Sequence, residues 1–200
     1  MKYKFLSIIL LFSIILNSQT IVEDGKIELN FVKSKAIAKH ASRTAIIIKT
    51  DKLKTIFVKV KITSPSGKKE IIDVNKFYLI DELSNSRIKL IDVNYQKFTS
   101  YLGFDRLVDK KKSGKKKRTF LYEFNSSIQD TFYKFDKDGY KNVVLPINFG
   151  TIRKPDNQII HFRPKKFKSQ NLLLFFPFLK DSNNAILYYG DTKIQNFPIE

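Results

Sequence analysis

The densest group of chemically active side chains is the basic run at residues 109–118. Seven of its side chains are positive and one is negative, which leaves a net charge of +6. Like charges this close together repel one another unless water or a bound anion screens them. The run therefore predicts either a solvated loop tip or a contact point for an anionic ligand. The candidate anion-binding residues are Lys110, Lys111, Lys112, Lys115, Lys116, Lys117 and Arg118.

The charge of the whole chain points toward the same class of partner. The formal net charge is +18, and loss of Lys2 and Lys4 with an N-terminal leader would lower it by two to +16. A strongly positive surface attracts polyanions. Anionic polysaccharide, lipopolysaccharide, nucleic acid or another envelope protein are the partners we expect. Only six of the 37 basic residues are Arg, and this preference for Lys is also typical of an AT-rich genome.

Residues that could perform catalysis or hold a metal are few. The chain has two His and no Cys, so zinc lacks its usual ligands and a nucleophile lacks a plausible base. His40 has no partner nearby in the sequence, and His161 alternates with Ile160 and Phe162 in a predicted strand. We predict no catalytic residue, no metal site and no cofactor. The leading interpretation is a non-enzymatic binding or structural module, and the alternative is a glycan-directed hydrolase that uses an unrecognised carboxylate pair.

A short acidic segment resembles part of a calcium-binding loop but lacks the required ligands. If Gly139 were position six of such a loop, position one would be Lys134 and position twelve would be Leu145. Neither residue supplies a carboxylate. Asp138 and Gly139 instead predict a hairpin turn between strands at residues 131–135 and 142–147.

The aromatic residues Tyr95, Phe98, Tyr101 and Phe104 recur every three positions. This spacing predicts a helical or 3₁₀ crossover. One function for such a ladder is stacking on the bases of single-stranded nucleic acid. Because aromatic side chains usually bury their large apolar area, we favour a crossover that fills one end of the fold.

The N-terminus has the pattern of a signal peptide at residues 1–20. Lys2 and Lys4 precede an apolar run at residues 5–16, and polar residues follow it. This run is shorter than the ~20 residues that a membrane-spanning helix needs, so we expect no transmembrane segment in the mature chain. The mature chain is expected to start at a residue from Gln19 to Ile21, and the lack of Cys excludes an acylated N-terminus. The predicted location is periplasmic or secreted.

Alternating apolar residues predict an all-β fold. Residues 56–62 place one apolar set on a single face of a strand, a Pro-Ser-Gly turn follows, and residues 77–80 and 88–91 form a predicted hairpin beside it. Other predicted strands lie at residues 26–32, 44–49, 119–124, 159–163, 172–178 and 185–189, whereas residues 33–43 are expected to be a basic helical turn or a loop. Residues 21–200 are then a single domain, with a division near residues 105–119 as the alternative. The expected core residues are Ile56, Val58, Val60, Ile62, Leu79, Leu173 and Phe175.

Two parts of the chain carry a resemblance to a known family. Residues 72–81 with the hairpin after them, and the run 172–177 with the apolar run 186–189, resemble immunoglobulin-like domains of unknown function in bacterial secreted proteins and lipoproteins. These pieces cover under half of the chain. The resemblance implies an antiparallel immunoglobulin-like β-sandwich of seven to ten strands and names no functional residue. Pro177 is expected to end its strand or to lie at an edge.

Overall fold

The computed structural model describes residues 19–37, 52–108, 131–148, 151 and 153–199, together with the backbone of residues 46–47 and 122–123. This part of the chain is mostly β-strand with almost no helix and forms a sandwich of two main sheets, which confirms the predicted all-β class. The main sheets hold six and five strands, and three smaller sheets join them. The described strands therefore outnumber the predicted seven to ten, because short pieces of strand pair along the loops.

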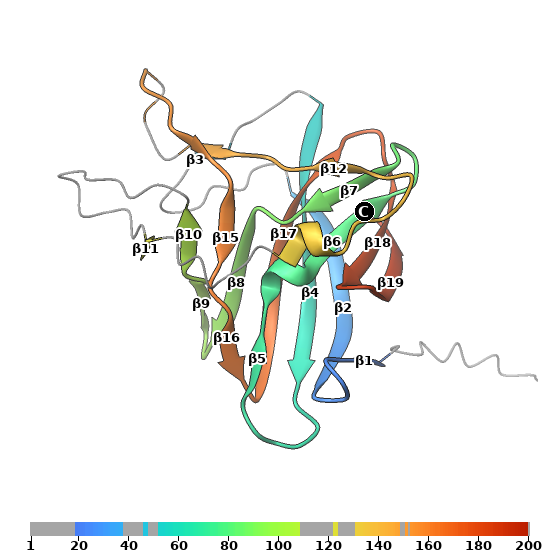
Figure 1. Ribbon diagram of the computed structural model, residues 1–200, viewed down its shortest axis with the longest axis vertical. Coiled ribbons are helices and arrows are strands. Elements are labelled where there is room, and N and C mark those ends of the chain that lie inside the picture. Colours follow the sequence, from blue (N-terminus) through green and yellow to red (C-terminus); the bar gives the residue numbers. More distant parts are fainter. Residues whose placement is uncertain are drawn as a thin grey trace, which may run out of the picture.

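The larger sheet is antiparallel throughout and is built around its three longest strands. Figure 1 shows β2, β4 and β17 running side by side, with β8 and β9 beyond β17. Alternation between apolar and polar residues, typical of a strand with one buried face, is clearest in β4. In sheet order its strands are β1 (Gln19–Val22), β2 (Ile27–Ile37), β4 (Leu53–Thr63), β17 (Ser169–Leu179), β8 (Asp92–Lys97) and β9 (Ser100–Gly103).

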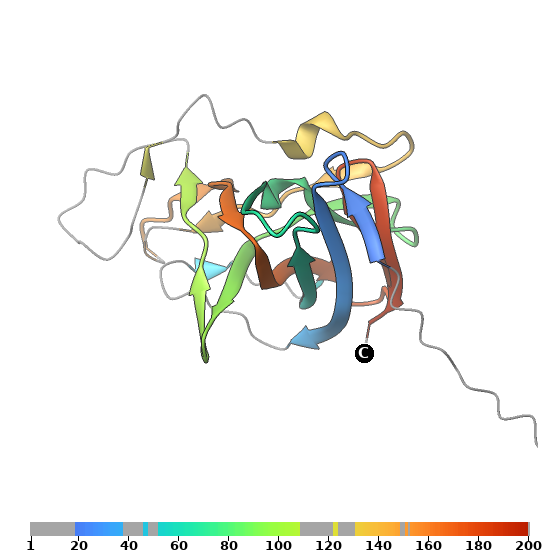
Figure 2. The ribbon, with the colours of Figure 1, turned by 90° about the horizontal axis from the view of Figure 1, so that it is seen from below.

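The central strands of the smaller main sheet are buried on both of their faces. The inner face of this sheet packs against the larger sheet, and its outer face holds a second apolar cluster, in which Tyr78, Ile80 and Ile186 surround Phe132 of the 3₁₀ helix η2 (Thr131–Lys134). Figure 2 shows the sandwich from below, with η2 at its edge. In sheet order its strands are β12 (Lys141–Val143), β7 (Ser86–Lys89), β6 (Phe77–Asp81), β18 (Asn184–Tyr189) and β19 (Thr192–Pro198).

The remaining elements are short. One sheet joins β11 (Tyr122–Glu123), β10 (Arg106–Val108) and β15 (Ile160–Phe162), and another joins β14 (Asn157–Gln158), β13 (Ile147–Asn148) and β3 (Ile46–Ile47). The last sheet pairs β16 (Lys165–Phe167) with β5 (Glu70–Ile72), and η1 (Val74–Lys76) is a second 3₁₀ helix.

The core confirms most of the predicted residues. The alternating set on β4 and Leu79 on β6 are buried. Leu173 is only half-buried, and Phe175 is buried on the opposite face, where its ring lies 6.4 Å from that of Phe57. The inner face of β17 is instead formed by the even-numbered residues Leu172, Leu174, Phe176 and Phe178. Because residues 172–178 are apolar at every position, their sequence does not show which face points inward.

The order of strands after β4 differs from the prediction of three neighbours. A turn at residues 64–67 does reverse the chain, and the Gly67 N–H donates to the Ser64 carbonyl at 3.0 Å. The next strand, β5, pairs with β16, and the chain then crosses to the smaller main sheet through η1. The predicted hairpin of β6 and β7 is confirmed there.

The predicted helical crossover at residues 95–104 is wrong, because β8 and β9 form an antiparallel hairpin. Side chains of a strand alternate between faces, so a spacing of three separates the four aromatics. Tyr95 and Phe104 pack edge to face at 5.7 Å inside the fold, whereas Phe98 and Tyr101 are exposed.

Two other local predictions need correction, and of the two expectations for Pro177 only the edge position is met. Residues 131–134 form η2 rather than a strand, since Phe132 fills the outer apolar cluster. The Asp138–Gly139 turn is present, with the Tyr140 N–H donating to the Lys137 carbonyl at 3.2 Å, but it leads into β12, which pairs in parallel with β7. Pro177 does not end β17. It lies opposite Thr55, beyond the part of β17 that pairs with β8, so the strand there has a ladder on one side only.

Candidate functional site

The predicted basic run at residues 110–118 and His40 lie outside the described residues. His161 lies on β15, is buried, and has its Nδ1 atom 3.5 Å from Nζ of Lys89. Within the described ranges, no group of three or more His, Cys, Asp or Glu side chains is placed to hold a metal ion. None of the helices in these ranges is long and apolar enough to cross a membrane.

Four lysines gather on the outer face of the larger sheet, which we call the lysine row. Lys33 and Lys35 belong to β2, and Lys59 and Lys61 belong to β4. Lys33 lies directly opposite Lys59 in the register of the two strands. Like charges directly opposite one another destabilise a sheet. Among the described residues, none of the four lysines forms an ion pair with a carboxylate, so the row is a local excess of positive charge.

A β-bulge places the lysines of β2 on this face. Ile27, Leu29 and Phe31 point inward, and without an interruption Lys33 would point inward as well. The register shifts between Phe31 and Lys33, so the intervening Val32 is an extra residue. After the bulge the lysines face outward and Ser34 and Ala36 face inward. The predicted helical turn or loop at residues 33–43 is therefore wrong as far as Ile37, where β2 ends.

Acidic residues on the same sheet face have other partners. The Glu28 carboxylate accepts a hydrogen bond from the Asn30 side-chain amide at 2.8 Å. The Asp92 carboxylate on β8 forms an ion pair with Arg106 at 2.8 Å. These acids do not form ion pairs with the lysine row, so its charge remains available to a ligand.

A hollow of about 280 Å³, which we call the amide pocket, lies next to Lys61. The side-chain amide of Asn171 donates to Oε1 of Gln96 at 3.2 Å, and that of Gln96 donates to the Phe98 carbonyl at 3.2 Å. The Gln170 amide donates to the Gln96 carbonyl. These bonds hold three amide groups in fixed orientations at the end of the lysine row. The lining residues are Lys61, Gln96, Phe98, Ser169, Gln170 and Asn171.

Phe98 forms the tip of the β8–β9 hairpin beside this pocket. Its side chain is 86% exposed, and its φ of 53° lies in the left-handed region that Gly and Asn normally occupy. The recurrence of aromatic residues every three positions drew attention to Phe98, but it did not indicate that this side chain would be exposed. No local pattern connects it with Gln170 and Asn171, which come from a distant strand.

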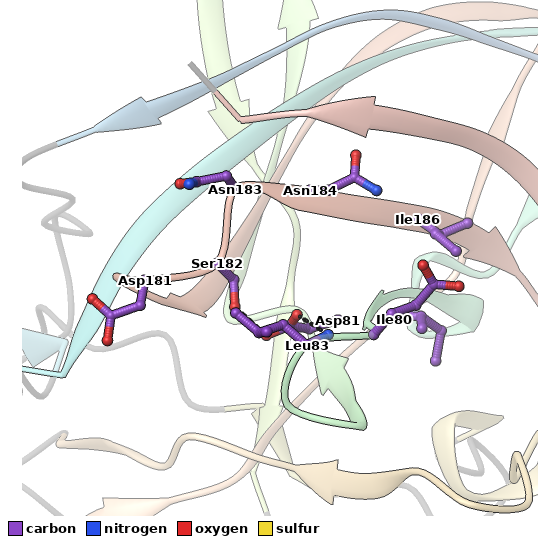
Figure 3. A pocket seen from close by; sticks show the side chains of 9 residues that line it. Ile80, Asp81, Leu83, Asp181, Ser182, Asn183, Asn184 and Ile186 are labelled. Atoms are coloured by element: carbon purple, nitrogen blue, oxygen red, sulfur yellow. Dashed lines mark hydrogen bonds between the residues drawn. The ribbon is translucent and has the colours of Figure 1, made fainter.

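A larger pocket of about 480 Å³ lies between the β6–β7 turn and the β17–β18 turn (Figure 3). It bears on the hydrolase alternative only in that three acidic residues, Asp81, Glu82 and Asp181, line it. The buried Asp81 carboxylate accepts hydrogen bonds from the Leu83 N–H at 3.1 Å and from the Ser182 hydroxyl at 2.6 Å, as well as one from the Ser84 hydroxyl. In Figure 3 the Asp181 side chain points away from Asp81. Asp81 thus joins two turns, which is a structural role.

Asp73 is a second carboxylate with an unusual environment. Burial raises the pKa of its carboxyl group, although hydrogen bonds from Asn75 and Thr131 and the charge of Lys76 oppose the change. A raised pKa can indicate a general acid. Here the Asp73 carboxylate accepts the Asn75 N–H at 3.0 Å and caps η1, and it lines neither of the two pockets described above.

The capping role of Asp73 predicts a specific dependence on pH. Folding favours the protonated form of a carboxyl whose pKa is raised, so its stabilising contribution is complete below about pH 4 and is lost as pH rises through the raised pKa. Asn is as effective as Asp at capping the N-terminus of a helix, and it carries no charge. We expect Asp73→Asn to be at least as stable as wild type at pH 7, and its relative stability to increase from about pH 4 to pH 7. Urea unfolding across this range measures the difference, and a constant difference would contradict the expectation.

No family model, no curated protein and no solved structure matches this chain, so the resemblance to immunoglobulin-like domains stays a prediction.

Proposed function

We propose that this chain is an exported, non-enzymatic binding module that holds an anionic polymer on the outer face of its larger sheet. The observation that carries the proposal is the pairing of Lys33 with Lys59, together with Lys35 and Lys61 on the same face. A like-charge pair opposes folding, and in the described part of the chain no carboxylate pairs with these residues. A bound polyanion would turn this unfavourable arrangement into a favourable one.

The geometry of the lysine row suits a linear polymer. Neighbouring strands lie about 4.8 Å apart, and residues two apart along a strand are separated by about 6.8 Å. Positive charges on such a grid match a chain that carries one negative charge per repeating unit. Lysine attracts phosphate and carboxylate as a flexible point charge, so this surface would select its ligands by their negative charge more than by their shape.

Two predicted features extend the proposal beyond the described residues. The signal-peptide pattern of residues 1–20 supports export to the periplasm or the exterior. The basic run at residues 110–118 would add a second contact for the same polymer. Its net charge of +6 exceeds that of the lysine row, so both must be measured.

The test compares two variants with the same change in charge. One replaces Lys33, Lys35, Lys59 and Lys61 with Ser. The control replaces four exposed lysines outside this face with Ser, namely Lys134, Lys141, Lys180 and Lys193. Binding of heparin and of single-stranded DNA is titrated over a range of salt concentrations.

Loss of the lysine row should make the salt dependence shallower, because fewer counterions are released. For single-stranded DNA the slope of log K against log salt should fall by up to about 3, whereas the control variant should change it much less. A third variant with Lys110, Lys111, Lys112, Lys115, Lys116 and Lys117 changed to Ser measures the basic run. Equal affinities and slopes in the lysine-row variant and its control would show that the row is not the binding face.

A further inference from the structure

The amide pocket at the end of the lysine row has features that charge attraction alone does not need. Its hydrogen-bonding groups come from β8 and β17, and a single exposed aromatic ring stands at its rim. From these features we infer that the pocket and Phe98 bind one sugar ring of an acidic polysaccharide. This inference rests on the proposed function, because Lys61 both lines the pocket and belongs to the lysine row.

Phe98 carries two local penalties at once. A large side chain in the left-handed region is strained, and the tip of a two-residue turn normally takes Gly, Asn or Asp. Its ring is also 86% exposed and so buries little apolar area within the fold. A ligand that covers the ring would supply the missing burial. The apolar C–H face of a pyranose has the size and flatness for this contact.

The amides supply the second half of a sugar site. An amide group both donates and accepts hydrogen bonds, as a sugar hydroxyl does. Gln96, Gln170 and Asn171 are cross-linked by hydrogen bonds, so their free positions are held in place before any ligand arrives. Such pre-organisation lowers the entropy lost on binding. Lys61 is placed to meet a carboxylate on the same sugar, which makes a uronic acid the unit that fits best.

The arrangement favours a sugar over single-stranded nucleic acid. Proteins that bind single strands stack successive bases on successive rings. The hairpin divides its four aromatics, since Tyr95 and Phe104 pack in the interior and only Phe98 and Tyr101 are exposed. One ring at the rim of an amide-lined hollow matches a unit that is rich in hydroxyls.

The first test replaces Phe98 with Asn, which relieves the backbone strain while it removes the ring. We expect Phe98→Asn to be at least as stable as wild type and to bind oligogalacturonate about five- to tenfold more weakly. Its affinity for polyphosphate, which offers charge without a sugar ring, should not change. The control is Leu83→Asn, because Leu83 is 72% exposed at a turn outside the amide pocket. Unchanged oligogalacturonate affinity in Phe98→Asn would overturn the inference. A variant that binds oligo-dT more weakly but oligogalacturonate as tightly as wild type would overturn it as well.

The second test uses the absence of Trp from the chain. In Phe98→Trp the only indole emission comes from the pocket rim. Oligogalacturonate should shift this emission to shorter wavelength and polyphosphate should not, and the opposite pattern would overturn the inference. Repeating the titration with Lys33, Lys35 and Lys59 changed to Ser, and with Lys61 of the pocket kept, separates the two proposals. Loss of polyphosphate binding in this variant would support the lysine row as the charged surface. A blue shift that oligogalacturonate still produces in it would support the pocket as the sugar site, and loss of that shift would contradict the inference.

Discussion

Replacement of Arg87 with Ala is expected to lower the free energy of unfolding by about 3–5 kcal/mol. The Arg87 side chain is fully buried on β7. It donates to the carbonyl oxygens of Phe132 and Phe135 and, at 2.8 Å, to Oδ1 of Asn142, and its guanidinium lies 3.9 Å from the centroid of the Phe132 ring. Alanine would leave these acceptors without their donor and would open a cavity between the smaller main sheet and η2.

Urea unfolding followed by circular dichroism measures this loss. Arg87→Lys should fall between wild type and Arg87→Ala, because an ammonium keeps the charge but cannot reach three acceptors in a fixed fork. The control is Asp136→Asn. Its carboxylate is 3.5 Å from the guanidinium but is 67% exposed, so we expect a change below about 1 kcal/mol. Similar losses in Arg87→Ala and Asp136→Asn would contradict the assigned role of Arg87.

Substitution of Asn75 by Asp is expected to lower the free energy of unfolding by about 2–4 kcal/mol at pH 7, although the two side chains have the same shape. Asn75 is buried on η1. Its Oδ1 accepts the Phe162 N–H at 2.8 Å, and its Nδ2 donates to the Phe162 carbonyl at 2.8 Å and to Oδ1 of Asp73 at 2.7 Å. The side-chain amide thus exchanges two hydrogen bonds with the Phe162 backbone, as a neighbouring strand of β15 would. An aspartate keeps the acceptor but places a negative charge against two oxygens.

The effect of Asn75→Asp should decrease at low pH, because a protonated carboxyl can donate again. Hydrogen exchange at the Phe162 amide should also become faster, since the repulsion between the new carboxylate and the two oxygens makes local opening of this bridge more frequent. Asn196→Asp on β19 adds the same charge at an exposed position and should change stability by less than about 0.5 kcal/mol. If the two variants lost equal stability, the bridge between η1 and β15 would not be an important contact.

The sequence by itself determined the features that depend on local patterns. Alternation at residues 56–62 predicted a strand with one buried face, because neighbouring side chains of a strand point to opposite sides. The polar segment between two apolar runs predicted the β6–β7 hairpin for a similar reason. Together such patterns were sufficient for the all-β class. They also predicted that Lys59 and Lys61 would face away from the core.

Only the tertiary structure decided which distant residues meet. The apolar run of β17 has no polar face, so its orientation depends on the sheet that covers it, and Leu173 was assigned wrongly for that reason. The aromatics at residues 95–104 recur every three positions, and this spacing led to the prediction of a helix. The same spacing also occurs in the β8–β9 hairpin that the structure has, so the spacing does not distinguish the two. The burial of Arg87 depends on η2 and β12, which come much later in the chain.

The candidate site depends on the tertiary structure most strongly. Lys33 has the same parity as the inward residues Leu29 and Phe31, so the alternation alone ends the predicted strand at Val32. The bulge at Val32 reverses the faces and brings Lys33 opposite Lys59. Gln96 and Asn171 likewise meet only because β8 pairs with β17. A bulge and a strand register are set by long-range packing, and this is the physical reason that the sequence predicted the positive charge of this protein but not the face that gathers it.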